Sequence, residues 1–168
     1  LFVEQRASGS RAWVFTSATL GTDDDLAWFC ESAALEDARK LRVGSPFDYP
    51  ANARTWVPPK FPKPNEASHP AAVGALAARL AGRLGGRTFV LTTTLRVLPL
   101  IAEALTEAAI AQGQPLHVLV QGTHPKRSLL ERFLDTPNSV LVGSQSFWEG
   151  IDIPGSALQC VIIDKLPF

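Results

Sequence analysis

Apolar residues follow two alternating patterns in the second half of this chain. Uninterrupted runs rich in β-branched residues predict strands at residues 88–91, 116–120, 140–142 and 160–163. Between them, apolar residues recur at helical spacing and predict helices that begin at His69 and that cover residues 96–112 and 125–134. The runs at 140–142 and 160–163 are typical of strands buried on both faces. The alternation predicts an α/β fold, a parallel sheet with right-handed crossovers and flanking helices.

Helical spacing also predicts which side chains are buried in two of these helices. The first helix ends at Gly85-Gly86, and its predicted buried stripe is Val73, Leu76, Ala77, Leu80 and Leu84. The second ends at Gly113, and its predicted stripe is Leu98, Ile101, Ala102, Leu105 and Ala109. Both stripes should face the sheet or a neighbouring helix.

The N-terminal part predicts shorter elements. Apolar and β-branched residues indicate strands at 12–16 and 40–43, and a helix lies between them at 24–35. Thr22 and Asp25 have the spacing of a capping box for that helix.

Residues 44–67 contain six prolines, at positions 46, 50, 58, 59, 62 and 64. Proline excludes a continuous helix and a central strand, so at most a short strand fits, at 55–57. This segment is long for a loop, which indicates a functional surface or a tether.

A polar, glycine-bearing loop joins the last two predicted strands. It carries Ser144, Gln145, Ser146, Glu149 and Asp152. Loops that leave the carboxyl ends of parallel strands carry the binding chemistry of open α/β sheets, so this loop is a candidate site. The alternative is a plain connection between core strands, with Phe147 and Trp148 as packing residues.

A second candidate corner follows the strand at 88–91. Thr92, Thr93 and Thr94 lead from that strand into a helix, and hydroxyl and N–H groups at a helix N-terminus bind anions. A threonine N-cap is the alternative, and both can hold together. Gln121 ends the next strand and is expected at the same edge of the sheet.

Composition restricts the class of protein. The 168 residues are 46% hydrophobic, enough for one α/β domain with a core. The 16 basic and 16 acidic residues cancel, so any contact with nucleic acid must be local. Cys30 and Cys160 are too few for a disulfide framework or a metal site, and no signal peptide or membrane-spanning run is found. We therefore expect a cytoplasmic protein that contacts no membrane and binds no metal through this chain.

Three motifs resemble those of the DinG and YoaA branch of the XPD-like superfamily 2 DNA helicases. The run GSQSFWEGIDIPG, followed by LQCVIIDKLPF, resembles motif V and the strand after it. The run VFTSATL at residues 14–20 resembles motif III, and VLTTT at residues 90–94 resembles motif IV. The motifs occur in the family's order and cover most of the chain.

The resemblance implies a domain arrangement. Residues 1–20 would be the end of a first lobe that carries motif III, and residues 21–168 the second RecA-like helicase lobe, truncated before motif VI. The interrupted family-like sequence at Leu1 and at Pro167-Phe168 predicts a piece cut from a longer chain.

The resemblance also assigns roles to residues. Ser17, Ala18 and Thr19 would couple ATP turnover to strand separation. Glu149, Gly150 and Asp152 would face ATP. The residues expected to face DNA are Thr92, Thr93, Thr94, Gln121, Ser144 and Gln145.

The implied activity is ATP-driven translocation on single-stranded DNA and duplex unwinding in bacterial DNA repair or replication. Its partners would be single-stranded or forked DNA, ATP with Mg²⁺, and the first lobe of the same chain. Such a protein would work in the bacterial cytoplasm, at the nucleoid. An iron–sulfur cluster is possible in the parent protein.

The departures from the family pattern are equally specific. No P-loop, D-E-x-H box, cluster-binding cysteines or motif VI is present, so the chain alone is expected to hydrolyse no ATP. The run Val161-Ile162-Ile163-Asp164 imitates a Walker B strand, and the missing P-loop argues against that interpretation. Two alternatives stay open: a non-catalytic RecA-like interaction module that binds a protein through the proline-rich segment and Trp56, and a lobe of a helicase-like nuclease.

Overall fold

The computed structural model describes residues 12–166. The chain divides into two compact units, residues 1–56 and 57–168. The two units are defined by their compactness, so they do not test the predicted lobe boundary after residue 20, which stays a prediction.

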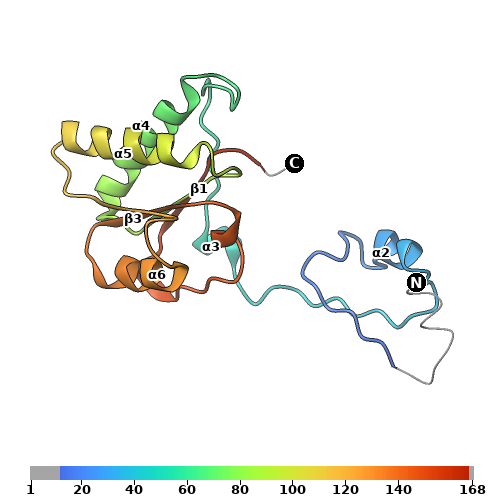
Figure 1. Cartoon of the computed structure of the whole chain (residues 1–168). Helices are drawn as coiled ribbons and strands as arrows, with labels where there is room; N and C mark the ends of the chain where they lie inside the picture. Colours follow the sequence, from blue (N-terminus) through green and yellow to red (C-terminus); the bar gives the residue numbers. More distant parts are fainter. Residues whose placement is uncertain (1–11, 167–168) are drawn as a thin grey trace. The chain divides into compact units, whose positions relative to one another are not determined.

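A parallel four-stranded sheet forms the centre of the second unit (Figure 1). Its strands are β1 (Thr88–Leu91), β2 (His117–Val120), β3 (Ser139–Gly143) and β4 (Cys160–Ile163). They lie in the order β2-β3-β1-β4, with β1 and β3 in the middle. The registers pair Leu91 with Gly143 and with Ile163, and Val120 with Val142, so the carboxyl ends of all four strands meet at one edge. The predicted parallel α/β fold is confirmed.

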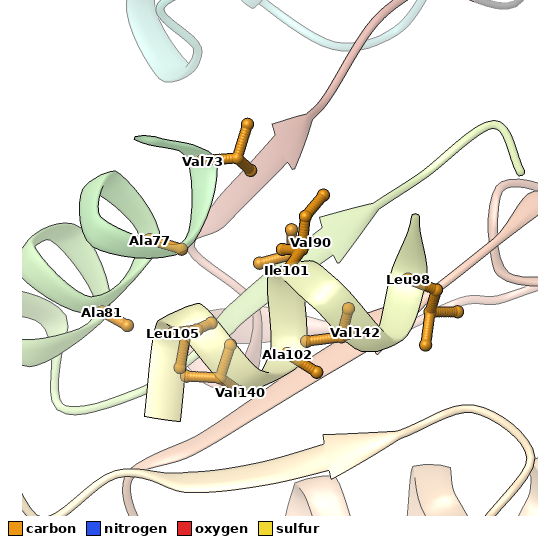
Figure 2. Close-up of a cluster of buried hydrophobic side chains, with 10 residues drawn as sticks. All are labelled: Val73, Ala77, Ala81, Val90, Leu98, Ile101, Ala102, Leu105, Val140 and Val142. Carbon is orange, nitrogen blue, oxygen red and sulfur yellow. The ribbon is translucent and has the colours of Figure 1, made fainter. Parts of the chain in front are cut away.

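Three helices cover the two faces of this sheet. They are α4 (His69–Leu84), α5 (Leu98–Ala111) and α6 (Lys126–Asp135). Val90, Val140 and Val142 pack with α4 and α5 on one face (Figure 2), whereas Phe89 and Leu141 pack with α6 on the other. Successive strand residues point to opposite faces, so each central strand contributes to both cores.

The buried face of α5 is as predicted, and that of α4 is shifted. All five predicted α5 residues are buried. In α4 the buried residues are His69, Val73, Gly74, Ala77, Ala78 and Ala81, whereas Leu76, Leu80 and Leu84 are only partly buried. The cause is close helix packing: a Cβ placed on Gly74 would lie 2.6 Å from the backbone nitrogen of Leu105. Small residues therefore form the α4 surface that faces α5, and Gly85 ends the helix as predicted, with φ 64°.

Burial of both faces is confirmed for β3 and wrong for β4. Every residue of β3 is buried, whereas Val161 and Ile163 are 50% and 44% exposed. The exposed side chains lie on one face of this edge strand, whereas Ile162 on the other face packs against the core formed with α4 and α5. A run of β-branched residues reports strand propensity, and burial depends on what covers the strand.

The described residues of the first unit contain two short helices, α2 (Ala27–Ser32) and α3 (Tyr49–Asn52). The strands predicted at 12–16, 40–43 and 55–57 are not formed. Val14, Leu41 and Val43 are 84%, 83% and 78% exposed, and no partner strand pairs with them in the described range. Without a ladder, apolar sequence alone does not make a strand.

The start of α2 also differs from the prediction. The helix begins at Ala27, its N-cap residue is Leu26, and no capping box forms between Thr22 and Asp25. The carboxylate of Asp23 instead accepts a hydrogen bond of 3.0 Å from the Ala27 N–H. That bond lowers the pKa of Asp23.

Candidate nucleic-acid interface

The predicted site residues of the second unit lie at the carboxyl edge of the sheet. Gln121 follows β2, Ser144 follows β3 and Thr92 follows β1, while Asp164 follows β4. Because the strands are parallel and in register, these four positions form a row in the order of the strands. The topology thus brings together residues separated by up to 72 positions in the sequence, from Thr92 to Asp164.

Gln121 and Ser144 are joined directly. The side-chain oxygen of Gln121 accepts hydrogen bonds from the backbone N–H of Ser144 at 2.6 Å and from its hydroxyl at 3.0 Å. The backbone N–H of Gln121 donates to the carbonyl of Val142 at 2.9 Å, which extends the β2–β3 ladder. Because the oxygen is engaged, the NH₂ group of Gln121 is the part available as a donor to another molecule.

The three threonines have different environments. Thr92 is fully buried, its N–H donates to the carbonyl of Gly143 at 2.8 Å, and its hydroxyl donates to the carbonyl of Thr94 at 3.0 Å. Thr93 is partly exposed, and its hydroxyl is a buried group with no hydrogen-bond partner. Thr94 is exposed. The structure therefore uses the Thr92 side chain to close a turn and exposes the residue two positions later.

The threonine N-cap is wrong. Helix α5 begins at Leu98, and its N-cap residue is Val97, with no side-chain cap. The threonines precede that helix end by several residues, so their hydroxyls do not satisfy its first N–H groups.

The loop after β3 has both packing residues and exposed polar residues, as its two interpretations from the sequence predict. A single 3₁₀ turn, η1 (Gln145–Phe147), buries the Phe147 ring against the α6 face of the core. Lys126 of α6 holds this turn from outside, because its ammonium donates to the carbonyl of Ser146 at 2.6 Å and lies 5.5 Å from the centre of the Phe147 ring. The aromatic residues thus pack as core, which leaves the polar residues outward.

The exposed residues of this loop include Gln145, Ser146, Glu149, Gly150 and Asp152. Gly150 has a φ of 67°, a left-handed conformation that favours glycine, and no atom lies within 4 Å of the position its Cβ would take. The predicted nucleotide-facing residues are therefore open to solvent on one segment.

Asp164 is a candidate that the sequence interpretation missed. It is 8% exposed, and its carboxylate accepts a hydrogen bond of 3.2 Å from the backbone N–H of Thr93. Burial raises the pKa of Asp164, against hydrogen bonds from Lys165 and Thr93 and the charges of His69 and Lys165. The sequence contains one indication of this role, because Asp164 is an acid that directly follows a predicted strand at the candidate edge.

The motif III residues belong to the first unit. Ser17, Ala18 and Thr19 are all exposed in an irregular segment that ends in a turn. The Ser17 hydroxyl accepts from the Thr19 N–H at 3.1 Å and lies 3.2 Å from the Thr19 hydroxyl. The hydroxyls therefore stabilise their own turn.

Residues 12–166 offer neither a metal-binding cluster nor a membrane-spanning helix. No group of three or more His, Cys, Asp and Glu side chains in this range could hold a metal ion. No helix in the same range has the length and apolar character to cross a membrane.

Comparison with known proteins identifies the family. Residues 78–168 match the family described as helicase C-terminal domain. The ATP-dependent DNA helicase YoaA of Haemophilus influenzae is 38% identical over 99% of this chain and 25% of its own length. YoaA of Escherichia coli K12 is 37% identical over 99% of this chain and 26% of its own length. The ATP-dependent helicase DinG of Mycobacterium tuberculosis H37Rv is 35% identical over 92% of this chain and 23% of its own length.

The chain thus spans about a quarter of the length of these curated relatives. Its parallel sheet with helices on both faces is consistent with a RecA-like helicase lobe. The family match covers the β1 and β3 loops and extends through β4. As its motifs predict, this chain belongs to the helicase C-terminal domain family, with DinG and YoaA helicases among its relatives.

Proposed function

We propose that this chain is the C-terminal motor lobe of an ATP-dependent DNA helicase that moves along single-stranded DNA and unwinds duplexes in repair or replication. The observation that carries the proposal is the row of loop residues at one sheet edge. In that row Gln121 and Ser144 are hydrogen-bonded to each other, next to the Thr92–Thr94 loop. The named relatives are ATP-dependent DNA helicases, which supports DNA as the substrate of this row.

The DNA-facing side of the row is built from neutral donors. The NH₂ group of Gln121, the Thr94 hydroxyl and the side chain of Gln145 can each donate to a phosphate or sugar oxygen. Neutral donors suit a motor that must release each phosphate as it steps. The chain's balanced charge agrees with contacts of this kind.

The nucleotide-facing side is the exposed segment with Glu149, Gly150 and Asp152. An open backbone at Gly150 allows close approach of a ligand, and Asp152 can accept from a ribose hydroxyl or a metal-bound water. ATP and Mg²⁺ would be held together with the first lobe of the same chain, because this chain has no phosphate-binding loop. Bound ATP supplies the phosphoryl group, and these residues sense its presence by position and charge.

The same proposal extends to the wider setting. Single-stranded or forked DNA would be the substrate and the bacterial cytoplasm the place of action, with an iron–sulfur cluster possible elsewhere in the parent. Ser17, Ala18 and Thr19 would connect this lobe to the first one.

The test uses the full-length protein that contains this chain. DNA-stimulated ATPase and unwinding are measured for the wild type, for Asp152→Ala and for Ser156→Ala, an exposed neighbour outside the predicted set. We expect Asp152→Ala to lose ATP turnover while circular dichroism shows native folding, and Ser156→Ala to behave as wild type. A folded wild type that neither binds ATP nor responds to DNA would refute the proposal and favour an interaction module.

The isolated chain provides a second test. We expect residues 1–168 alone to hydrolyse no ATP at a measurable rate, because positioning of the phosphates by a P-loop is missing. ATPase activity that follows the purified chain through successive chromatography steps would contradict this.

A helicase-like nuclease is the second candidate. The relative named 3'-5' exonuclease DinG from Bacillus subtilis is 28% identical over the whole of this chain and 19% of its own length. Degradation of labelled DNA by the full-length protein, with and without ATP, separates the two functions. A motor yields intact single strands, whereas a nuclease yields shortened ones.

A further inference from the structure

Two backbone N–H groups at the site edge are held by side chains from the outer strands. Gln121, after the outer strand β2, accepts from the Ser144 N–H at the end of β3. Asp164, after the outer strand β4, accepts from the Thr93 N–H at the end of β1. The loops that follow the two central strands are therefore each fixed from one side by a side-chain oxygen.

The register of β4 against β1 brings Asp164 to this position. Ile163 pairs with Leu91, and the N–H of Asp164 donates to the Leu91 carbonyl at 3.1 Å. The Asp164 backbone therefore belongs to the ladder, which fixes the starting point of its side chain. The carboxylate then reaches Thr93, two residues beyond the end of β1.

The Thr92–Thr94 loop has few other restraints. Thr92 is tied to β3 through the Gly143 carbonyl, and the Thr92 hydroxyl closes the turn onto Thr94. At Thr93 the hydroxyl makes no hydrogen bond, so the N–H bond to Asp164 is the polar contact that fixes this residue among those described. Loss of the carboxylate would release Thr93 while the rest of the strand pairing stays.

His69 is a buried residue whose charge opposes the rise that burial causes in the pKa of the Asp164 carboxyl. It is 3% exposed at the start of α4, its Nδ1 donates to the carbonyl of Pro62 at 2.8 Å, and its Nε2 has no partner. Its ring packs edge-on against Phe61, with ring centres 5.8 Å apart. His69 thus links the start of α4 to Pro62 of the proline-rich segment, and Asp164 itself is 8% exposed.

We propose that Asp164 is the positioning residue of the Thr92–Thr94 loop, and that its carboxylate fixes the Thr93 backbone so that Thr94 is presented to a phosphate of single-stranded DNA. The inference rests on the proposed function, since it assigns a role within the same DNA site. Asp164 itself touches no DNA in this account. Its carboxylate oxygen is directed at the Thr93 N–H, inside the protein.

The test compares three changes in the full-length protein. Asp164→Ala removes the acceptor, Asp164→Asn keeps an acceptor oxygen without the charge, and Asp135→Ala removes an exposed acid at the far end of α6. Affinity for a labelled single-stranded oligonucleotide is measured, together with the DNA concentration that half-stimulates ATPase and the rate at saturating DNA.

A positioning role predicts a specific pattern. Asp164→Ala should weaken DNA binding and raise the half-stimulating DNA concentration by about three- to tenfold, the value of one hydrogen bond, with the saturated rate unchanged. Asp164→Asn and Asp135→Ala should stay within about twofold of the wild type, because both keep an acceptor for Thr93. If Asp164→Ala fails to fold, Asp164→Ser replaces it. Serine also removes the bond to Thr93, because its hydroxyl is too short to reach that N–H.

Three results would overturn the inference. Equal DNA affinity of Asp164→Ala and the wild type would show that the loop needs no anchor. Tighter binding by both Asp164→Ala and Asp164→Asn would show that the residue acts as a repulsive charge. A wild type that binds no single-stranded DNA would remove the proposed function and this inference together, whereas the first two results leave the proposed function standing.

Discussion

Gly74 is the position where the packing of this lobe can be tested most directly. A Cβ placed there would lie 2.6 Å from the Leu105 nitrogen, 2.7 Å from the Ala104 Cβ and 2.8 Å from the Ala104 carbonyl carbon. Each distance is well inside the 3.4 Å at which ordinary van der Waals contact begins. Two of the three atoms belong to the α5 backbone, so the clash in Gly74→Ala can be relieved only by moving α4 and α5 apart.

Two terms of opposite sign decide the outcome. Overpacking of a tight core contact costs about 1–3 kcal/mol. Replacement of glycine by alanine within a helix stabilises the helix by up to about 1 kcal/mol. We therefore expect Gly74→Ala to lower the free energy of unfolding by about 1–2 kcal/mol.

Gly82 is the matched control within the same helix. A Cβ there would contact the side-chain amide of Gln114, which can rotate away, and no backbone atom is among its nearest neighbours. The helix-propensity term is the same as at Gly74, so Gly82→Ala should be neutral or stabilising by up to about 1 kcal/mol. Comparison of the two variants isolates the cost of separating α4 from α5.

The assay is urea unfolding of the chain followed by far-ultraviolet circular dichroism, with the free energy taken from the midpoint and the slope. Adding Ala104→Gly to Gly74→Ala should recover only part of the loss, because the Leu105 nitrogen stays in place. A Gly74→Ala variant as stable as Gly82→Ala would refute the close approach of α4 and α5.

Three further predictions concern the site edge. Gln121→Leu should lower the free energy of unfolding by about 1–3 kcal/mol, because the buried Ser144 N–H loses its acceptor. The control is Gln112→Leu, at an exposed helix end, and equal urea midpoints of the two variants would contradict the hydrogen bond between Gln121 and Ser144. Gly143→Ala should displace the Phe147 ring, which lies 2.8 Å from the added Cβ, and destabilise by about 1–3 kcal/mol; an unchanged near-ultraviolet dichroism spectrum and midpoint would argue against it. Burial raises the pKa of Asp164 in the folded state above the ordinary value of 3.8. The wild type should therefore lose stability relative to Asp164→Asn as the pH rises from about 3.8 through that higher pKa. If the urea midpoints of the two proteins differ by a constant amount across this range, the pKa of the Asp164 carboxyl is not raised.

The elements of the second unit could be predicted because their signals are local. Each strand is a short β-branched run, and α5 shows its buried stripe in the spacing of five apolar residues, all of which are buried. The order of the strands and their registers are not local, so the alternation of strands and helices predicted a parallel sheet without fixing either. The β4 prediction was wrong on burial for a similar reason, because exposure of Val161 and Ile163 depends on what covers their face of the sheet.

The wrong predictions in the first unit have a related cause. Residues 12–16 and 40–43 have strand-like composition, and a strand also needs a partner to satisfy its N–H and C=O groups. In α4 the spacing gave a stripe of leucines, whereas the helix turns its glycine and alanines toward α5. Periodicity identifies an apolar face, and the size of the residues decides how closely that face can be approached.

The site edge shows which part of a binding site a sequence conceals. Thr92, Gln121 and Ser144 could be placed at this edge because each follows a predicted strand, and Thr92 and Ser144 also lie in motifs that resemble those of the family. Asp164 follows a strand equally, and its partner is 71 residues away, at Thr93, so its role emerges only from the register of β4 on β1.

In both pairs an outer strand supplies an oxygen and a central strand supplies the loop N–H that binds it. A change at Gln121 or Asp164 therefore reaches the site through the backbone of a neighbouring loop. This arrangement would allow two outer positions to tune the proposed DNA contacts while the central strands keep their ladder. The Thr92 N–H donates to the Gly143 carbonyl and joins the two loops, so the effects of changes at Gln121 and Asp164 should be coupled.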